Sequence, residues 1–186
     1  FNIEYPTYKG VRIKETFDGK IENQDNGYLL ELTPRESVVP TYIDIEFDKN
    51  LKLDKLNIER TLFPGTPGNL NIFKKNNYYQ WEANKLNLKK LEFSILDNKD
   101  FEWVEGEITG SGFVSKDLSD FDGNILLKNG EYRKLNFAES DIKFYQNGES
   151  LKLESILKTK DGGIIEIIYK SDEYDQKITS IETYRS

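Results

Sequence analysis

Hydrophobic and polar positions alternate along residues 141–171 in a way that predicts three antiparallel strands. Asn147-Gly148 separates the first two strands, and this pair favours a two-residue turn because both residues tolerate a positive φ. Such a turn would place Phe144 opposite Leu151. The apolar side chains of this hairpin then share one face and the polar side chains share the other, as expected for an antiparallel sheet with one buried face.

The second connection, Asp161-Gly162-Gly163, predicts a three-residue loop with a glycine in the left-handed conformation. This loop would pair Lys158 with Glu166 and Glu154 with Lys170, so that opposite charges face each other. The three strands would then share one continuous apolar face, made of Ile142, Phe144, Leu151, Leu153, Leu157, Ile165, Ile167 and Tyr169.

Similar patterns along the rest of the chain predict further strands. Thr41 to Asp48 alternates without a break. A hairpin that turns at Asn129-Gly130 is expected within residues 125–135, and a short helical turn is one option near residues 84–88. Other strands are expected at residues 11–13, 28–32, 69–73, 78–81, 91–95, 101–115 and 177–184.

These patterns give roughly ten to twelve short strands with a turn about every 8 to 12 residues, which is typical of an all-β fold. The run of sequential hairpins favours an antiparallel meander that forms a β-sandwich or an up-and-down barrel, with little or no helix. Phe63 to Asn69 holds two of the five prolines, and we interpret it as a loop rather than a linker. We therefore expect one domain over residues 1–186.

The composition limits the chemistry that is available. The chain contains no cysteine, histidine or methionine, which excludes a Ser-His-Asp triad, a thiolate nucleophile, a Cys/His zinc site and a disulfide. Any metal site would need oxygen ligands, as Ca²⁺ and Mg²⁺ sites have. The sequence shows no cofactor motif, and we expect no cofactor.

The charge and the first residue bear on partners and location. The net charge is −7, and the sequence contains no cluster of Lys and Arg. Nucleic acid and anionic membranes are therefore unfavourable partners. No apolar run approaches the length of a membrane-spanning helix. The sequence starts at Phe1 rather than Met, so we interpret it as processed or trimmed and favour an extracytoplasmic location.

The first candidate site is an acidic strand face made by Asp44, Glu46 and Asp48. A three-residue loop at residues 48–50 would also set Asp54 opposite Asp44, with their Cβ atoms about 5 Å apart. Such a pair could hold a cation, or serve as the two carboxyls of a glycoside hydrolase. The alternatives are a solvated face neutralised by nearby lysines, and a negative patch that speeds encounter with a basic protein.

The second candidate site is aromatic. Tyr78, Tyr79 and Trp103 lie on predicted strands, and such side chains on a rigid sheet suit stacking on sugars or anchoring a protein partner. They suit a hydrophobic core equally well. Tyr79 and Trp81 would share one face of their strand, so we expect Trp81 inside and Tyr78 outside.

Two further motifs are weaker. Residues 117–124 contain the D-x-D-G core of an EF-hand-like loop, but Asn129 stands at the twelfth position, where a bidentate glutamate belongs. Gly106, Gly110 and Gly112 fall inside a long strand pattern, where glycine marks a bulge or a sharp bend more often than a phosphate loop.

Three functional hypotheses remain open. The first is a non-enzymatic binding module that recognises a protein or a glycan through exposed aromatic residues and an acidic surface. The second is a β-barrel that carries a small apolar ligand. The third is a carboxylate-based glycoside hydrolase that uses Asp44 and Asp54. We prefer the first, because the sequence offers no nucleophile–base pair and no cofactor motif.

Overall fold

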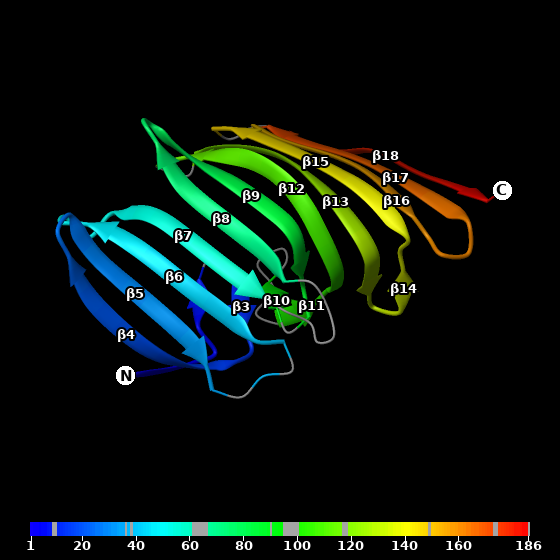
Figure 1. Cartoon of the computed structure of the whole chain (residues 1–186). Coiled ribbons are helices and arrows are strands. Elements are labelled where there is room, and N and C mark those ends of the chain that lie inside the picture. Colours follow the sequence, from blue (N-terminus) through cyan, green and yellow to red (C-terminus); the bar gives the residue numbers. More distant parts are fainter. Residues whose placement is uncertain are drawn as a thin grey trace.

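Every regular element in the described part of this computed structural model is a β-strand (Figure 1). The structure describes residues 1–8, 11–35, 37, 39–60, 67–89, 91–94, 101–116, 119–148, 150–172 and 175–185, with only the backbone for residues 8, 93, 94, 101 and 171 onward. The predicted all-β fold is confirmed. No helix that is long and apolar enough to cross a membrane occurs among these residues.

Fourteen strands form one large antiparallel sheet. They are β1 (Asn2–Glu4), β4 (Thr16–Gln24), β5 (Gly27–Pro34), β6 (Thr41–Asp48), β7 (Leu53–Arg60), β8 (Gly68–Lys75), β9 (Tyr78–Asn87), β12 (Glu105–Ser115), β13 (Asp120–Tyr132), β14 (Leu135–Asn136), β15 (Glu139–Asn147), β16 (Ser150–Lys158), β17 (Gly163–Asp172) and β18 (Asp175–Arg185).

The large sheet is an open meander. Its strands follow the order β1-β4-β5-β6-β7-β8-β9-β12-β13-β15-β16-β17-β18, and β14 pairs with β13. Within the described residues β1 pairs only with β4 and β18 only with β17, so the two edges do not close the sheet. The predicted meander is confirmed, and the predicted up-and-down barrel is wrong. Figure 1 shows the two termini at opposite ends of a curved layer of strands.

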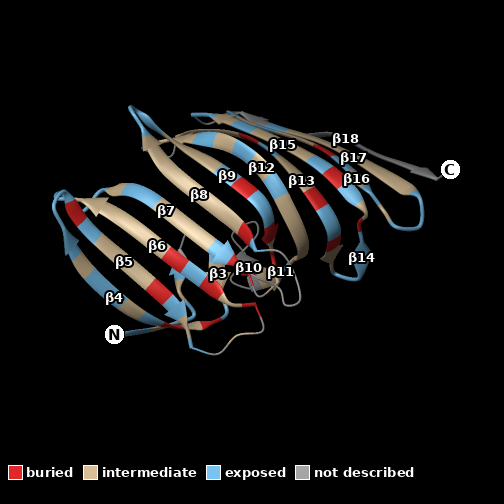
Figure 2. Ribbon diagram, in the orientation of Figure 1, coloured by how far each residue is buried: buried red, intermediate tan, exposed pale blue. Residues whose placement is uncertain are grey.

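A second, small sheet contains β2 (Thr7–Tyr8), β3 (Val11–Ile13), β10 (Leu91–Ser94) and β11 (Phe101–Trp103), in the order β11-β10-β3-β2. Ile13 packs against both clusters of buried apolar residues, one around Phe17 and Ile43 and the other around Leu91 and Leu127. The small sheet thus covers part of one face of the large sheet, and two-layer packing is limited to that part. Figure 2 shows the buried residues as short bands on strands that are otherwise intermediate or exposed.

The cross-strand registers define two faces of the large sheet, because directly opposite residues share a face. The inner face carries the buried clusters, and the outer face carries the residues that alternate with them. The apolar pattern of the inner face continues across nine strands, in the row Ile43, Ile58, Leu70, Ala83, Gly110, Ile125, Ile142, Ser155 and Ile167.

Glycines on two central strands make room for an aromatic stack on the inner face. The rings of Trp81 and Phe144 are stacked, with centroids 6.0 Å apart and planes at 9°. Gly112 and Gly123 lie between them in the row across β9, β12, β13 and β15. A Cβ at Gly123 would lie 2.4 Å from Phe144 and 2.5 Å from Trp81, so these positions need glycine for close packing.

The predicted register of the first hairpin in residues 141–171 is wrong. Phe144 lies opposite Leu153, not Leu151, and Asn147 lies opposite Ser150. The tight turn therefore begins at Gly148, which has a φ of 56°, one residue later than predicted. Moving the turn by one residue changes each partner by two positions, so every side chain keeps its face.

The second turn is also shifted by one residue, but it lies one residue earlier than predicted. The loop has three residues and a left-handed glycine, as predicted, but it is closed by Thr159 N donating to Gly163 O at 2.8 Å. Gly162, with a φ of 90°, is the left-handed glycine. Lys158 and Glu154 consequently lie opposite Ile164 and Ile168, and both predicted pairs of opposite charges are wrong. The apolar face keeps its predicted members.

The predicted hairpin at Asn129-Gly130 is also wrong. β13 continues past it and turns at Arg133 and Lys134, whose φ angles are 46° and 72°. Asn129, with a φ of 51°, lies at a register shift opposite Gly106, where β12 and β13 form a bulge. Lys128 accordingly lies opposite Glu139 rather than Glu131, and these two side chains form an ion pair of 3.2 Å.

Two other predictions need correction, and a third falls mostly on residues outside the described part of the chain. The single strand predicted over residues 101–115 is divided at Val104, and its two parts, β11 and β12, belong to different sheets. The optional helical turn near residues 84–88 is wrong, because β9 continues through a bulge at Lys85, which has a φ of 49°. Most of the predicted loop Phe63–Asn69 lies outside the described residues.

Candidate functional site

The structure separates the two carboxyls of the acidic candidate. Asp44 lies opposite Asn57, whose Nδ2 donates to Asp44 Oδ2 at 3.4 Å. A register shift between Glu46 and Phe47 leaves Asp54 at a bulge, where it accepts a hydrogen bond from Lys74 Nζ at 2.9 Å. The predicted pairing of Asp44 with Asp54 is therefore wrong, and the directly opposite carboxyls on which the hydrolase hypothesis depended are absent at these two residues.

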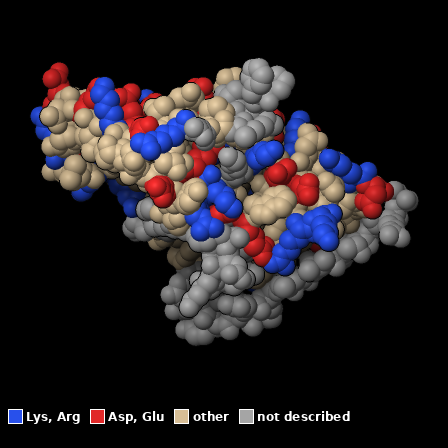
Figure 3. Space-filling view, turned by 90° about the horizontal axis from the view of Figure 1, so that it is seen from below, with Lys and Arg blue, Asp and Glu red and all other residues tan. Residues whose placement is uncertain are grey.

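Lysines lie against the other carboxylates of this acidic strand. Glu46 pairs with Lys55 at 3.1 Å, and Asp48 lies 3.7 Å from Lys74. Asp48 Oδ1 also accepts hydrogen bonds from the backbone N–H groups of Asn50 and Lys52, and the bond from Lys52 lowers the pKa of Asp48. These contacts fit a solvated, neutralised face. Acidic and basic side chains are likewise interspersed on the side of the molecule in Figure 3.

The turn beside this strand contains a residue in an unfavourable conformation. Leu51 is exposed and has a φ of 58°, a left-handed conformation that disfavours residues with a Cβ. We expect Leu51→Gly to raise the free energy of unfolding by about 1 kcal/mol in urea denaturation. Lys49→Gly is the control and should not stabilise the protein. A Leu51→Gly protein no more stable than the parent would contradict this account.

The predicted aromatic residues do not form one site. Tyr78 is 41 % exposed on the outer face, as expected. Tyr79 lies on the inner side with Trp81, and its hydroxyl donates to Leu53 O at 3.0 Å. Trp103 is exposed on β11 of the small sheet. Tyr78 instead meets a residue that the sequence did not single out, Phe113, with ring centroids 6.0 Å apart and planes at 69°.

Phe113 belongs to a row of directly opposite residues across the outer face, which we call the aromatic row. Aromatic side chains occupy every second strand of this row, on β8, β12 and β15, and hydrogen-bonding side chains occupy the strands between them. Phe113 and Tyr145 are 38 % and 44 % exposed. The aromatic row consists of Phe73, Gln80, Phe113, Asp122, Tyr145 and Lys152.

A second row runs beside the aromatic row on the outer face, two residues along each strand, and we call it the polar row. All of its members carry hydrogen-bonding side chains. Glu46 and Asp44 of the acidic strand lie in line with the aromatic row and the polar row, respectively. The polar row consists of Asn71, Glu82, Ser111, Asn124, Lys143 and Glu154.

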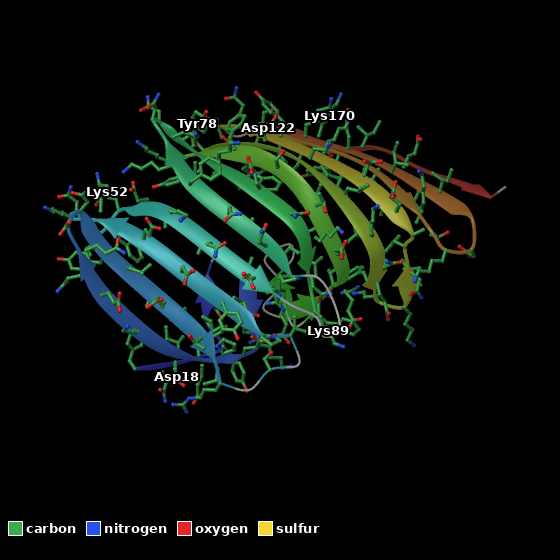
Figure 4. All side chains as sticks on the ribbon, viewed as in Figure 1. Asp18, Lys52, Tyr78, Lys89, Asp122 and Lys170 are labelled. Carbon is green, nitrogen blue, oxygen red and sulfur yellow. The ribbon has the colours of Figure 1, made fainter. Side chains whose placement is uncertain are left out.

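Shallow hollows interrupt the outer face along these rows. A hollow of about 500 Å³ lies beside Tyr78, Gln80 and Phe113. A second hollow of about 230 Å³ is lined by residues that include Asp122 and Tyr145. A third, of about 330 Å³, shares Asn124, Lys143 and Glu154 with the second and extends it to Ile156. In Figure 4, Tyr78, Asp122 and Lys170 lie along one side of the large sheet.

The described residues of the EF-hand-like motif do not form a carboxylate cluster. Asp120 and Asp122 lie in β13, and Asp120 Oδ1 accepts a hydrogen bond from Gly148 N at 2.9 Å. Residues 117 and 118 lie outside the described part of the chain. Among the residues that the structure describes, no group of three or more acidic side chains is placed to hold a metal ion.

Phe73, Phe113 and Tyr145 were missed as a set because their alignment depends on four strand registers. A signal was nevertheless present in the sequence. Phe113 alternates with Ser111 and Ser115, and so occupies a polar-face position of its strand. An aromatic residue on a face that is otherwise polar is more informative than an aromatic residue on an apolar face.

Comparisons with protein-family models, with curated proteins and with solved structures found no match for this chain. The geometry of the outer face is therefore the basis for a functional proposal.

Proposed function

We propose that the protein is a non-enzymatic binding module whose ligand, a protein or a glycan, lies across β8 to β16 on the outer face. The observation that carries the proposal is the aromatic row, in which half-exposed rings on alternate strands are separated by hydrogen-bonding side chains. Tyrosine and phenylalanine provide large contact areas at a low entropic cost. The acidic strand β6 lies in line with the row, separated from Phe73 by β7, and would contribute polar contacts at its rim.

The position of these side chains on strands supports binding over catalysis. A ladder of paired strands holds the rings of Phe113 and Tyr145 in fixed relative positions before a ligand arrives, which reduces the entropy lost on binding. Two of the nearby carboxylates are already engaged: Asp120 accepts from Gly148 N, and Glu154 pairs with Lys152 at 2.6 Å. The carrier hypothesis loses its basis because the sheet is open.

Removal of one ring should abolish most of the binding without unfolding the sheet. We expect Tyr145→Ala to weaken the binding of a ligand found in panels of immobilised proteins and glycans by about tenfold or more. Tyr42→Ala is the matched control, because Tyr42 is a tyrosine of the same exposure, 45 % against 44 %, outside the aromatic row. Affinity would be measured by surface plasmon resonance, and unfolding curves would verify both folds.

Comparing the two variants distinguishes binding at a specific surface from nonspecific binding to exposed tyrosines. Equal losses in Tyr145→Ala and Tyr42→Ala, or no loss in either, would contradict the proposed binding surface. Tight binding of the ligand by the double variant Phe113→Ala/Tyr145→Ala would also contradict the proposed binding surface.

A further inference from the structure

We propose that the ligand of the outer face is a linear, neutral polysaccharide that lies across the strands, with alternate sugar rings stacked on Phe113 and Tyr145. This inference rests on the proposed function and specifies the chemistry of its ligand. Phe113, Asp122 and Tyr145 are direct cross-strand neighbours on β12, β13 and β15. It follows that the two rings are separated by two strand spacings, which is about 10 Å.

That spacing suits a polymer with a two-unit repeat. In an extended chain of pyranose rings, alternate rings present their apolar C–H faces to the same side, at intervals of about two ring lengths. A platform on every second strand therefore meets every second sugar. Phe73 continues the same spacing on β8. Lys75 Nζ lies over its ring, 5.1 Å from the centroid, so this face of Phe73 is partly covered. Phe73 would therefore be a secondary platform at the end of the row.

Neighbouring contacts hold the two central rings in place. Tyr78 packs its ring against Phe113 at 69°, which fixes the orientation of Phe113 while leaving it 38 % exposed. The Tyr145 hydroxyl accepts a hydrogen bond from Asn147 Nδ2 at 3.1 Å. Both platforms are thus positioned before binding, which favours a flat, rigid ligand over one that needs a deep pocket.

The polar row supplies partners for sugar hydroxyls. It lies about 7 Å from the aromatic row, because two residues along a strand separate them. Ser111 and Asn124, both exposed, face the hollows beside Phe113 and Tyr145 and carry neutral groups that both donate and accept. Hydroxyls along the edge of a stacked sugar chain would meet this second row.

The charges in the hollows favour a neutral ligand. Among the residues that the structure describes, four carboxylates and two lysines line them, so an anionic polysaccharide would meet a weakly negative surface. A hydrogen bond from Lys152 holds the pKa of Glu154 below its usual value, so Glu154 is negatively charged at neutral pH and disfavours an anionic ligand. The charged residues are Asp120, Asp122, Asp141, Glu154, Lys143 and Lys152.

The surface suits a protein partner less well. Protein interfaces gain most of their affinity from a contiguous cluster of apolar anchors at the centre. Here the rings of Phe113 and Tyr145 are separated by Asp122, and the polar row flanks them along its whole length. Aromatic platforms distributed among hydrogen-bonding groups match the alternating apolar faces and polar edges of sugars.

The test uses the full chain and isothermal titration calorimetry with cellohexaose, mannohexaose, xylohexaose and chitohexaose, with hexagalacturonate as the anionic comparison. We expect at least one neutral hexasaccharide to bind, and its disaccharide to bind at least tenfold more weakly because it reaches one platform only. Tyr145→Ala and Phe113→Ala should each weaken binding about tenfold or more. Tyr145→Trp, which keeps a ring, and Tyr42→Ala should retain it.

Salt and the protein panel distinguish the possible failures. Binding of a neutral glycan should change less than twofold between low and high salt, because no charge pairs drive it. If no neutral hexasaccharide binds, or if the ring variants bind as well as the parent, the inference is overturned. A protein ligand that depends on Tyr145 while all glycans fail would overturn the glycan inference and leave the proposed function standing; failure of both panels would overturn both.

Discussion

Replacing Gly112 with alanine is expected to lower the free energy of unfolding by about 3 kcal/mol or more. A Cβ at this position would lie 1.9 Å from the backbone oxygen of Asp122 and 2.7 Å from Trp81 Nε1. The backbone oxygen belongs to the neighbouring strand of the ladder, so the clash cannot be relieved by a change of rotamer. β12 and β13 would have to separate, and the stacked pair of Trp81 and Phe144 would lose its support.

Gly163→Ala is the matched control for this prediction. A Cβ there would approach the Thr159 hydroxyl at 2.8 Å, and that side chain can rotate away. Guanidinium denaturation followed by circular dichroism would give both midpoints. Equal midpoints for the parent and Gly112→Ala would show that the two strands are not packed as closely as the structure places them.

Substitution of Glu15 by leucine should be about as damaging, with an expected loss of about 3 to 5 kcal/mol, because it would leave a buried cation without compensation. Arg60 is 1 % exposed and Glu15 is 3 % exposed. Burial lowers the pKa of Arg60 to about 10, and the nearby negative charge of Glu15 opposes that change. A lowered pKa means that burial makes the charged form of the guanidinium less favourable in the folded protein than in water.

The hydrogen bonds of this buried pair are incomplete. Arg60 Nη2 donates to the carbonyl oxygen of Lys89, and the Ser37 hydroxyl donates to Glu15 Oε1. Arg60 Nε and Nη1 and Glu15 Oε2 have no hydrogen-bond partner among the residues that the structure describes. Unsatisfied buried polar atoms cost free energy, so the favourable part of the arrangement is the attraction between the two charges.

A double-mutant cycle tests the coupling. Arg60→Leu and Glu15→Leu should each destabilise the protein strongly, and the combined variant should be more stable than the sum of the two losses indicates, because it removes both buried charges. Urea denaturation of the four proteins gives the coupling free energy. Strictly additive losses would mean that Glu15 does not compensate the charge of Arg60.

Alternation alone was sufficient to predict which face each residue of 141–171 occupies, but not its partner. The true turn begins at Gly148 and pairs Phe144 with Leu153. A shift of two positions preserves every face, so the hydrophobic pattern favours both registers equally. The preference of Asn147-Gly148 for a two-residue turn selected the first predicted register, and cross-strand charge pairs selected the second. Such charge pairs contribute a few tenths of a kcal/mol, too little to decide between turns.

The same limit explains why the residues of the candidate site were not predicted correctly. Asp44 and Asp54 were brought together by one assumed loop. The turn instead lies one residue later, with Phe47 opposite Leu53, and a bulge at Asp54 shifts the register once more. Bulges leave no alternation signal when the extra residue is polar. Tyr78 was correctly predicted to be exposed, whereas its neighbour Phe113 required the register between β9 and β12. The aromatic row is a property of six aligned strands, so no single segment of the sequence contains it.

The central claim, that ligands bind along the aromatic row of the outer face, is tested most directly by titrating ¹⁵N-labelled protein with cellohexaose, and with any other panel ligand that binds. The account predicts that amide shifts concentrate on Phe113, Asp122, Tyr145 and their neighbours on the outer face of β9 to β16. Shifts confined to the small sheet around Trp103, or to the acidic strand around Asp44, would contradict it.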